Sequence, residues 1–192
     1  MHANEPQRCP WCGQDPIYET YHDEEWGVPE RDSRALFEKL ILDGFQAGLS
    51  WITILRKRPA FRQAFEEFNP HVIARWVESD VEKLLKNVGI VRHGGKIRGA
   101  IASARAYENI EEKVGFDQFL WRYMDGKALQ NRFITQADVP PKTALSERIS
   151  KDLKAQGFTY CGPTIVYAFM EAVGMVNDHL ITCARHEQVA KL

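Results

Sequence analysis

Apolar side chains recur every three to four positions along most of this chain, which is the spacing of amphipathic helices. The clearest such face predicts a helix that begins at Asp32 or Ser33, both good N-caps, and runs towards Gly44. This face consists of Leu36, Phe37, Leu40 and Ile41. We expect the interval from Gly44 to Gly48 to break the helix.

Prolines and caps divide the rest of the chain into further helices. The helical period restarts at Ser50, and we expect Pro59 to interrupt it and to open the next helix. Other helix starts are predicted at Asn69-Pro70, Ser79-Asp80, Ser146 and Gly162-Pro163, with one more helix over Phe116–Met124. Residues 125–142 form the longest predicted loop, and we find no strand pairs or repeats. The pattern predicts an all-α protein of about ten short helices.

Composition narrows the class of protein. With 192 residues, 44% of them hydrophobic and a net charge of −1, the chain suits one soluble domain or two small lobes that share a cleft. It has neither an apolar run of the roughly 18–20 residues that span a bilayer nor the apolar core of a signal peptide. We therefore expect a cytoplasmic protein without membrane association, and reduced cysteines.

The segment PIYETYHDEEWGVP, residues 16–29, concentrates three aromatic residues around a histidine. These are Tyr18, Tyr21 and Trp26, with His22 between them. An amphipathic helix that turns its aromatic side chains to the core explains each of them singly. The alternative is a binding site completed by residues from elsewhere in the chain.

A metal site is one such possibility. Cys9 and His22 lie near one end of the chain, and His179 and Cys183 lie four residues apart near the other, so that one helical turn would bring the second pair together. Two cysteines and two histidines are a zinc ligand set. Cys9 and Cys12 also form a CxxC pair that is compatible with redox chemistry. Spacing alone leaves metal ligation, redox chemistry and plain reduced thiols open.

The segment Asp80–Tyr107 combines two predicted helices with a glycine-rich connection and a positive charge. Its glycines are Gly89, Gly94 and Gly95, and its basic side chains include Arg92, His93 and Lys96. A helix start that points free N–H groups outward suits a phosphate group. The alternative is an ordinary corner between two helices with solvated lysines.

Asp43 introduces a third feature, the segment LDGFQAGLSW at residues 42–51. Small residues there would admit a flat ligand, an aromatic side chain such as Trp51 would stack on it, and Asp43 would accept its hydrogen bonds. The simpler interpretation of Asp43 is an acid at the end of a helix, although the helix dipole disfavours negative charge there.

Taken together, these segments closely resemble the bacterial 3-methyladenine DNA glycosylase I family. The resemblance rests on Cys9-x-Trp11 and on the segments 15–29, 42–58, 89–97 and 169–183, and it spans roughly residues 8–183. It implies a helix-hairpin-helix glycosylase fold, with a leader at 1–8, one all-α domain with two lobes around a base-binding cleft at 9–185, and a tail at 186–192. The implied activity is removal of 3-methyladenine from alkylated double-stranded DNA by a monomer.

The resemblance also assigns roles to individual residues. It implies one structural zinc ion held by Cys9, His22, His179 and Cys183. Asp43, Tyr21 and Trp51 would be catalytic, and Tyr18, Trp26, Phe45 and Gln46 would bind the base. Gly89, Arg92, His93, Gly94, Gly95 and Lys96 would bind DNA. No lysine belongs to the pocket motif, so we expect base release without a Schiff-base lyase step.

Some positions depart from the family pattern. Asp43 stands where glutamate is common, Phe45 replaces a polar residue, Gly94 stands where arginine is frequent, and Cys12 lies outside the metal pattern. Two other classes of protein compete with a glycosylase. One is a zinc-stabilised DNA-binding module without chemistry, and the other is a CxxC oxidoreductase.

Overall fold

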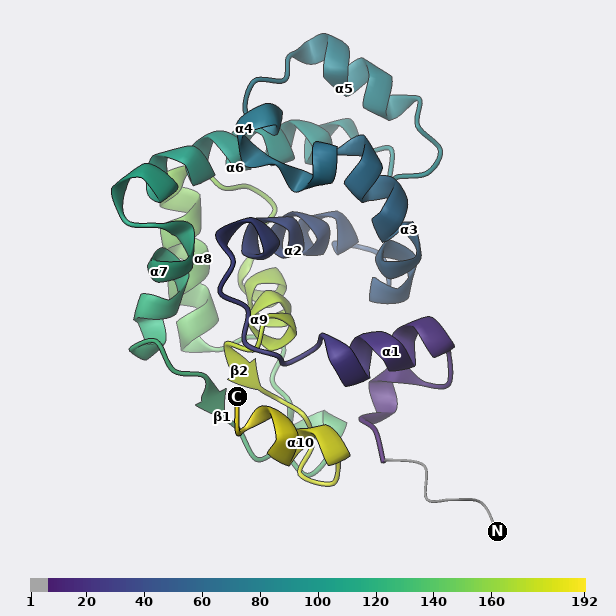
Figure 1. The fold of residues 1–192 in the computed structure, drawn as a ribbon, viewed down its shortest axis with the longest axis vertical. Helices are drawn as coiled ribbons and strands as arrows, with labels where there is room; N and C mark the ends of the chain where they lie inside the picture. Colours follow the sequence, from purple (N-terminus) through teal and green to yellow (C-terminus); the bar gives the residue numbers. More distant parts are fainter. Residues whose placement is uncertain (1–6) are drawn as a thin grey trace.

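The computed structural model describes residues 7–192, which are mostly helical and are joined by short turns (Figure 1). In this part of the chain the α-helices are α1 (Pro16–Glu24), α2 (Ser33–Gln46), α3 (Trp51–Ala64), α4 (Pro70–Ile73), α5 (Glu78–Leu85), α6 (Gly94–Lys113), α7 (Phe116–Trp121), α8 (Ala144–Gln156), α9 (Pro163–Ala172) and α10 (Ala184–Val189). Short 3₁₀ helices are η1 (Pro10–Cys12), η2 (Glu66–Phe68), η3 (Arg122–Met124) and η4 (Gln136–Asp138). The helical character predicted from the apolar spacing is confirmed.

One pair of very short strands was not predicted. β1 (Leu129–Gln130) and β2 (Val176–Asn177) run parallel, with Leu129 opposite Val176. β1 and η4 both lie within residues 125–142, so this predicted loop has some regular structure. The pair fixes the long connection after α7 beside the segment that follows α9.

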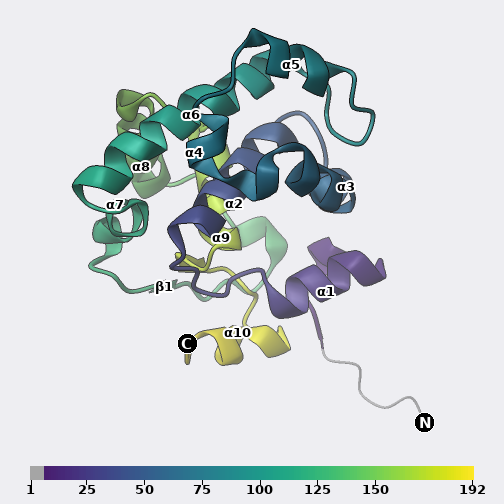
Figure 2. The same ribbon diagram turned by 45° about the horizontal axis from the view of Figure 1, so that its top comes forward.

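Helix α2 lies at the centre of the molecule and packs against α3, α6, α7 and α9 (Figures 1 and 2). A helix buried on nearly all sides is apolar nearly all round. The buried side chains of α2 accordingly include Leu36, Phe37, Leu40, Ile41, Leu42 and Phe45. Asp43 is buried among them, which makes it an exceptional residue in this core.

The two chain ends meet on the side of α2 away from α5. Both views place α1 and α10 at one end of the molecule and α5 at the other (Figures 1 and 2). The backbone N–H of Ala184 donates to the carbonyl of Gln7 at 2.9 Å, which joins the first described residues to the start of α10. Among residues 7–192, no helix combines the length and the apolar character of a bilayer-crossing segment.

Several predicted helix starts are confirmed. The side chain of Asp32 caps α2 by accepting from the N–H of Ala35 at 2.8 Å, and Asn69 caps α4 in the same way through the N–H of His71 at 3.1 Å. Pro163 is the first residue of α9, where its missing N–H costs nothing.

The predicted break between Gly44 and Gly48 is confirmed, because α2 ends at Gln46 within that interval. The helix continues past Gly44, whose missing side chain allows close packing: a Cβ there would lie 3.2 Å from the Cβ of Tyr160. Two other predicted boundaries were wrong. α3 continues through Pro59 instead of ending at it. α5 begins after Val77, not at Ser79, because the Asp80 carboxylate accepts from the Val77 N–H at 3.0 Å.

The described residues include only the end of the predicted leader but the whole of the predicted tail. Residues 1–6 of the predicted leader lie outside the described residues. The predicted tail, residues 186–192, begins inside α10 (Ala184–Val189), and its His186 and Val189 are buried against the rest of the molecule.

Candidate functional site

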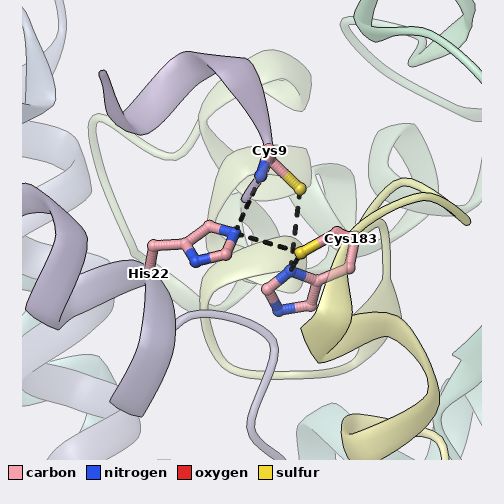
Figure 3. A group of neighbouring side chains, drawn as sticks. Cys9, His22 and Cys183 are labelled. Carbon is pink, nitrogen blue, oxygen red and sulfur yellow. Dashed lines mark hydrogen bonds between the residues drawn. The ribbon is translucent and has the colours of Figure 1, made fainter. Parts of the chain in front are cut away.

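Four residues from the two ends of the chain form a buried cluster. The ligand-type atoms of Cys9, His22, His179 and Cys183 all lie within 4.8 Å of one another, and all four residues are buried. Cys183 Sγ lies 3.5 Å from both His22 Nε2 and His179 Nδ1, and Cys9 Sγ lies 3.7 Å from His179 Nδ1. Figure 3 shows Cys9, His22 and Cys183 pointing towards one another. This cluster could hold a metal ion.

Neighbouring groups orient both imidazole rings. His22 Nδ1 lies 2.7 Å from a carboxylate oxygen of Asp23, and His179 Nε2 lies 3.0 Å from the carbonyl oxygen of Trp26. With those nitrogens donating, His22 Nε2 and His179 Nδ1 present lone pairs to the cluster. Metal-binding histidines are commonly held in this way.

The route by which His179 and Cys183 come together differs from our prediction. They do not share a helix: both precede α10, and a turn closed by the Cys183 N–H and the Leu180 carbonyl at 2.7 Å brings them together. Cys183 is the N-cap of α10, where its sulfur accepts from the Arg185 N–H at 3.4 Å. The hydrogen bond between the two thiols lowers the pKa of Cys183 and raises that of Cys9, so Cys183 more readily becomes the thiolate that a metal binds.

The CxxC pair is not arranged for redox chemistry. The Cys12 thiol donates to the carbonyl of Cys9 at 3.2 Å, whereas the Cys9 thiol faces the cluster. Burial raises the pKa of Cys12, which disfavours a reactive thiolate.

A pocket of about 200 Å³ adjoins the cluster. That volume is below the usual range for drug-sized ligands and suits a single flat ring system. Of the predicted site residues, the structure brings five aromatic and polar residues and one acid into its wall: Tyr18, Tyr21, Trp26, Asp43, Gln46 and Trp51. The remaining wall residues are Trp11, Lys39, Gln136, Ala168, Glu171 and Ala172.

Trp11 links the pocket to the cluster. Its ring lies 5.0 Å from that of Tyr18 and 4.9 Å from that of Trp26, and also 5.4 Å from the imidazole of His22. On the other side, Tyr21 and Trp51 are 5.4 Å apart. Burial raises the pKa of Tyr21 well above its ordinary value, so its hydroxyl stays neutral and can donate a hydrogen bond.

Asp43 is paired with a lysine on the same helix. Lys39, four residues earlier, donates to Asp43 Oδ1, and its ammonium lies 3.8 Å from the centre of the Trp51 ring. Burial raises the pKa of Asp43 and lowers that of Lys39, and their mutual attraction opposes both shifts. The motif at residues 42–51 contains no lysine, but Lys39, which lies outside it, belongs to the pocket wall.

Three buried polar atoms of the pocket wall have no hydrogen-bond partner. They are Asp43 Oδ2, Trp51 Nε1 and Trp11 Nε1, one acceptor and two donors. Buried polar groups are rarely left unpaired, and each unpaired group costs about 1–3 kcal/mol. Their residues all line the pocket, so a ligand bound there could supply the missing partners.

Phe45 does not belong to the pocket. It is 1% exposed and packs against Phe61 and Phe65, with ring centres 4.9 and 5.6 Å away. Because it follows Asp43 by two residues on a helix, it points to nearly the opposite side. The prediction that Phe45 binds a substrate was wrong.

Sequence reasoning missed two kinds of wall residue. Lys39 could have been found, because the i,i+4 spacing to Asp43 places both on one face of the predicted helix. Glu171 and Gln136 come from α9 and η4, and nothing in their local sequence indicates that these elements reach the pocket.

The glycine-rich connection leads into the N-terminus of α6 as predicted. His93 is the N-cap, with its Nδ1 accepting from the Lys96 N–H at 3.2 Å, and Gly94 and Gly95 are the first helical residues. A Cβ on Gly95 would lie 2.6 Å from the hydroxyl of Tyr160. Arg92 and His93 are exposed beside this helix start.

Lys96 has another role than the one predicted. Its side chain is buried, and its ammonium donates to the carbonyls of Phe45 at 2.9 Å and Ala47 at 2.6 Å. These carbonyls lie at the end of α2, where a helix lacks internal donors. Lys96 therefore ties the glycine-rich connection to the helix that carries Asp43.

The four basic side chains of α3 are largely engaged within the molecule; they are Arg56, Lys57, Arg58 and Arg62. Arg58 forms a bidentate pair with Glu25 at 2.5 and 2.7 Å, and Lys57 donates to the carbonyls of Val88 and Gly89, each at 3.2 Å. Arg56 and Arg62 also pair with acids.

The helical chain thus joins its two ends at a buried Cys₂His₂ cluster, which lies beside an aromatic pocket with a buried carboxylate. Comparison with known proteins identifies the family. Residues 11–186 match the family model described as methyladenine glycosylase, so the chain belongs to that family.

Individual relatives are similar over most of their length. DNA-3-methyladenine glycosylase 1 of Escherichia coli (strain K12) is 47% identical over 178 residues, which are 92% of this chain and 95% of that protein. A crystal structure of 3-methyladenine DNA glycosylase I has a TM-score of 0.91 at 49% identity and covers 93% of this chain and 98% of the other. A related crystal structure, a variant in complex with 3-methyladenine, has a TM-score of 0.90 at 37% identity, with 92% and 96% covered.

Proposed function

We propose that the protein is a DNA-repair glycosylase that flips 3-methyladenine out of alkylated DNA and removes it by hydrolysis. The family membership and the relatives named for this activity support the reaction class. The observation in this chain that carries the proposal is the buried, unpaired oxygen of Asp43, facing a pocket walled by aromatic rings.

The pocket suits the chemistry of the substrate. Methylation of the ring makes the adenine of the nucleotide cationic and therefore a good leaving group, so the enzyme mainly has to select this base among neutral ones. Electron-rich rings attract a cation by about 0.5–2 kcal/mol per good contact. A buried carboxylate adds a charge-assisted hydrogen bond that a neutral adenine makes less strongly.

The wall residues then have different roles in binding the base. Asp43 accepts from the cationic edge of the base, Trp51 and Tyr21 stack on it or bond to it, and Tyr18 and Trp26 close the wall with Gln46. Trp11, which the sequence did not assign, joins them because its indole N–H is unpaired and lies in the same wall.

Duplex DNA would bind at the connection between α5 and α6, which we propose to be a helix-hairpin-helix motif. The first amides of α6 lie at a helix N-terminus, and such a terminus attracts a phosphate group. Exposed Arg92 and His93 flank it, and Gly89, Gly94 and Gly95 allow a close approach of the backbone. Lys96 supports this motif from inside instead of contacting phosphate.

The cluster residues fit one structural zinc ion. Bond lengths of about 2.3 Å for Zn–S and 2.0–2.1 Å for Zn–N give sulfur–nitrogen edges of about 3.5–3.6 Å in a tetrahedron. Three of the four sulfur–nitrogen distances in the cluster are 3.5, 3.5 and 3.7 Å, and all ligand atoms lie within 4.8 Å of one another. Four protein ligands leave no open position, so the ion would fasten the two chain ends together and take no part in hydrolysis. A monomeric state and a cytoplasmic location stay predictions.

Chromatography of free bases tests the activity directly. Purified protein is incubated with methylated duplex DNA, and the released bases are separated and identified. Release of 3-methyladenine without strand cleavage supports a monofunctional glycosylase. DNA binding without base release would instead indicate the non-catalytic DNA-binding module.

Trapping with borohydride tests the lyase step. Because Lys39 lies in the pocket wall, a covalent adduct between the protein and DNA in the presence of borohydride would show Schiff-base chemistry. We expect no adduct, as for a monofunctional glycosylase.

A further inference from the structure

Lys39 occupies the position that the proposed function assigns to the base. Its ammonium bonds to Asp43, and it lies 3.8 Å from the centre of the Trp51 ring. A carboxylate on one side and an aromatic face on the other are the two contacts that would recognise a cationic purine. The protein therefore places its own cation against two of the groups that would recognise the base, namely Asp43 Oδ1 and the face of Trp51.

We propose that Lys39 is a specificity-determining residue that competes with the base for Asp43 and Trp51. The inference rests on the proposed function and deepens it. A base that stacks on the face of Trp51 covered by the ammonium must displace that ammonium, which is also bonded to a carboxylate that is only 2% exposed. A cationic base replaces one charge by another, whereas a neutral base leaves the buried carboxylate without a counter-charge, which is strongly unfavourable.

A second cavity gives the displaced ammonium a place to go. This cavity of about 230 Å³ shares Tyr21, Lys39 and Ala172 with the pocket wall. Its other charged residues are four acids and two arginines: Glu24, Glu25, Glu30, Glu38, Arg58 and Arg62. With more acids than bases around it, this cavity favours an added ammonium. The four-carbon stem of lysine allows such a change by rotation of its side-chain bonds.

Removal of the ammonium should therefore strengthen binding. Isothermal calorimetry would compare 3,9-dimethyladeninium, a fixed cation, with 9-methyladenine, its neutral counterpart. We expect wild type to bind only the cation measurably, and Lys39→Met to bind it about tenfold more tightly. The neutral probe should become detectable in Lys39→Met, because the ammonium must leave for this probe as well.

The same substitution at an exposed site provides the matched control. Lys151 lies exposed on α8, outside the wall of the pocket, and Lys151→Met should bind both probes as wild type does. If Lys39→Met binds the cation no more tightly than wild type, the competitor role is refuted. Weaker binding would also refute it, because Lys39 would then contribute to the bound state.

A measurement on the wild type covers the case in which Lys39→Met fails to fold. With ¹³Cε-labelled lysine, the Lys39 signal should shift when 3,9-dimethyladeninium is added, since the ammonium leaves the Trp51 ring. An unchanged Lys39 signal at saturation overturns the proposal. Base release by the wild-type protein distinguishes the competitor role of Lys39 from the proposed glycosylase function. If wild type releases the base but Lys39→Met binds the cation with unchanged affinity, only the competitor role is refuted. If wild type releases no base, the proposed function itself is refuted.

Discussion

Replacement of Asp43 by asparagine tests the central contact of the proposed function. The change keeps the size of the side chain and removes its charge. Asp43 is 2% exposed, so solvent screens this charge little, and its Oδ2 has no other partner. A hydrogen bond to a charged group contributes about 1.5–3 kcal/mol, so excision of 3-methyladenine should fall by about 10- to 150-fold.

The fold should survive this change. Lys39 loses its counter-ion in Asp43→Asn, but burial already lowers the pKa of Lys39, so the amine can give up its proton instead of staying buried as an unpaired cation. We therefore expect a modest loss of thermal stability and an unchanged metal content.

Single-turnover kinetics with saturating enzyme would measure this effect on the excision step itself. Asp125→Asn is a matched control, because Asp125 is exposed, lies outside the pocket wall and has a φ of 51°, which asparagine tolerates. Asp43→Glu should keep activity, since glutamate is common at this position in the family. If Asp43→Asn excises as fast as wild type while folded, another group recognises the base and the reasoning fails.

Three further predictions concern the metal, the DNA and the pH. Elemental analysis should find about one zinc per chain in wild type and in Cys161→Ser, and much less in Cys183→Ser; equal contents would reject the four-ligand site. Arg92→Ala should reduce the slope of log affinity for undamaged duplex against log salt by about one, if the guanidinium meets one phosphate. Lys96→Ala should instead lower the melting temperature, because its ammonium holds the end of α2. Burial raises the pKa of Asp43, and recognition of the base needs its carboxylate form. The excision rate should therefore be constant above that raised pKa and fall as the pH drops through it. The excision rate of Asp43→Asn should not show this fall.

Features encoded by neighbouring residues could be predicted from the sequence. Helix caps such as Asp32 and Asn69 act within three residues, and the apolar spacing of α2 reflects its own burial. The aromatic residues of segment 16–29 lie on or next to α1, so one short helix and the turn after it supply three residues of the pocket wall.

Features that depend on the direction of a side chain were harder to predict. Phe45 stands in the same motif as Asp43, but a separation of two residues turns it into the core. Lys96 stands in a basic, glycine-rich segment, but its ammonium points inward to the carbonyls of Phe45 and Ala47. A motif identifies which residues lie close together, and only the packed backbone decides which way each of them points.

The metal cluster and the pocket depend on each other through α1. This helix has nine residues, too few to be stable alone in water, so contacts outside it must hold it in place. His22 ties one face of α1 to the cluster, whereas Tyr18 and Tyr21 on the same helix form part of the pocket wall. Trp11 fills the space between the two sites and contacts residues of both. An ion that fastens His22 to the C-terminal segment would therefore also fix the distance of the aromatic wall from Asp43, which lies on the separately anchored helix α2.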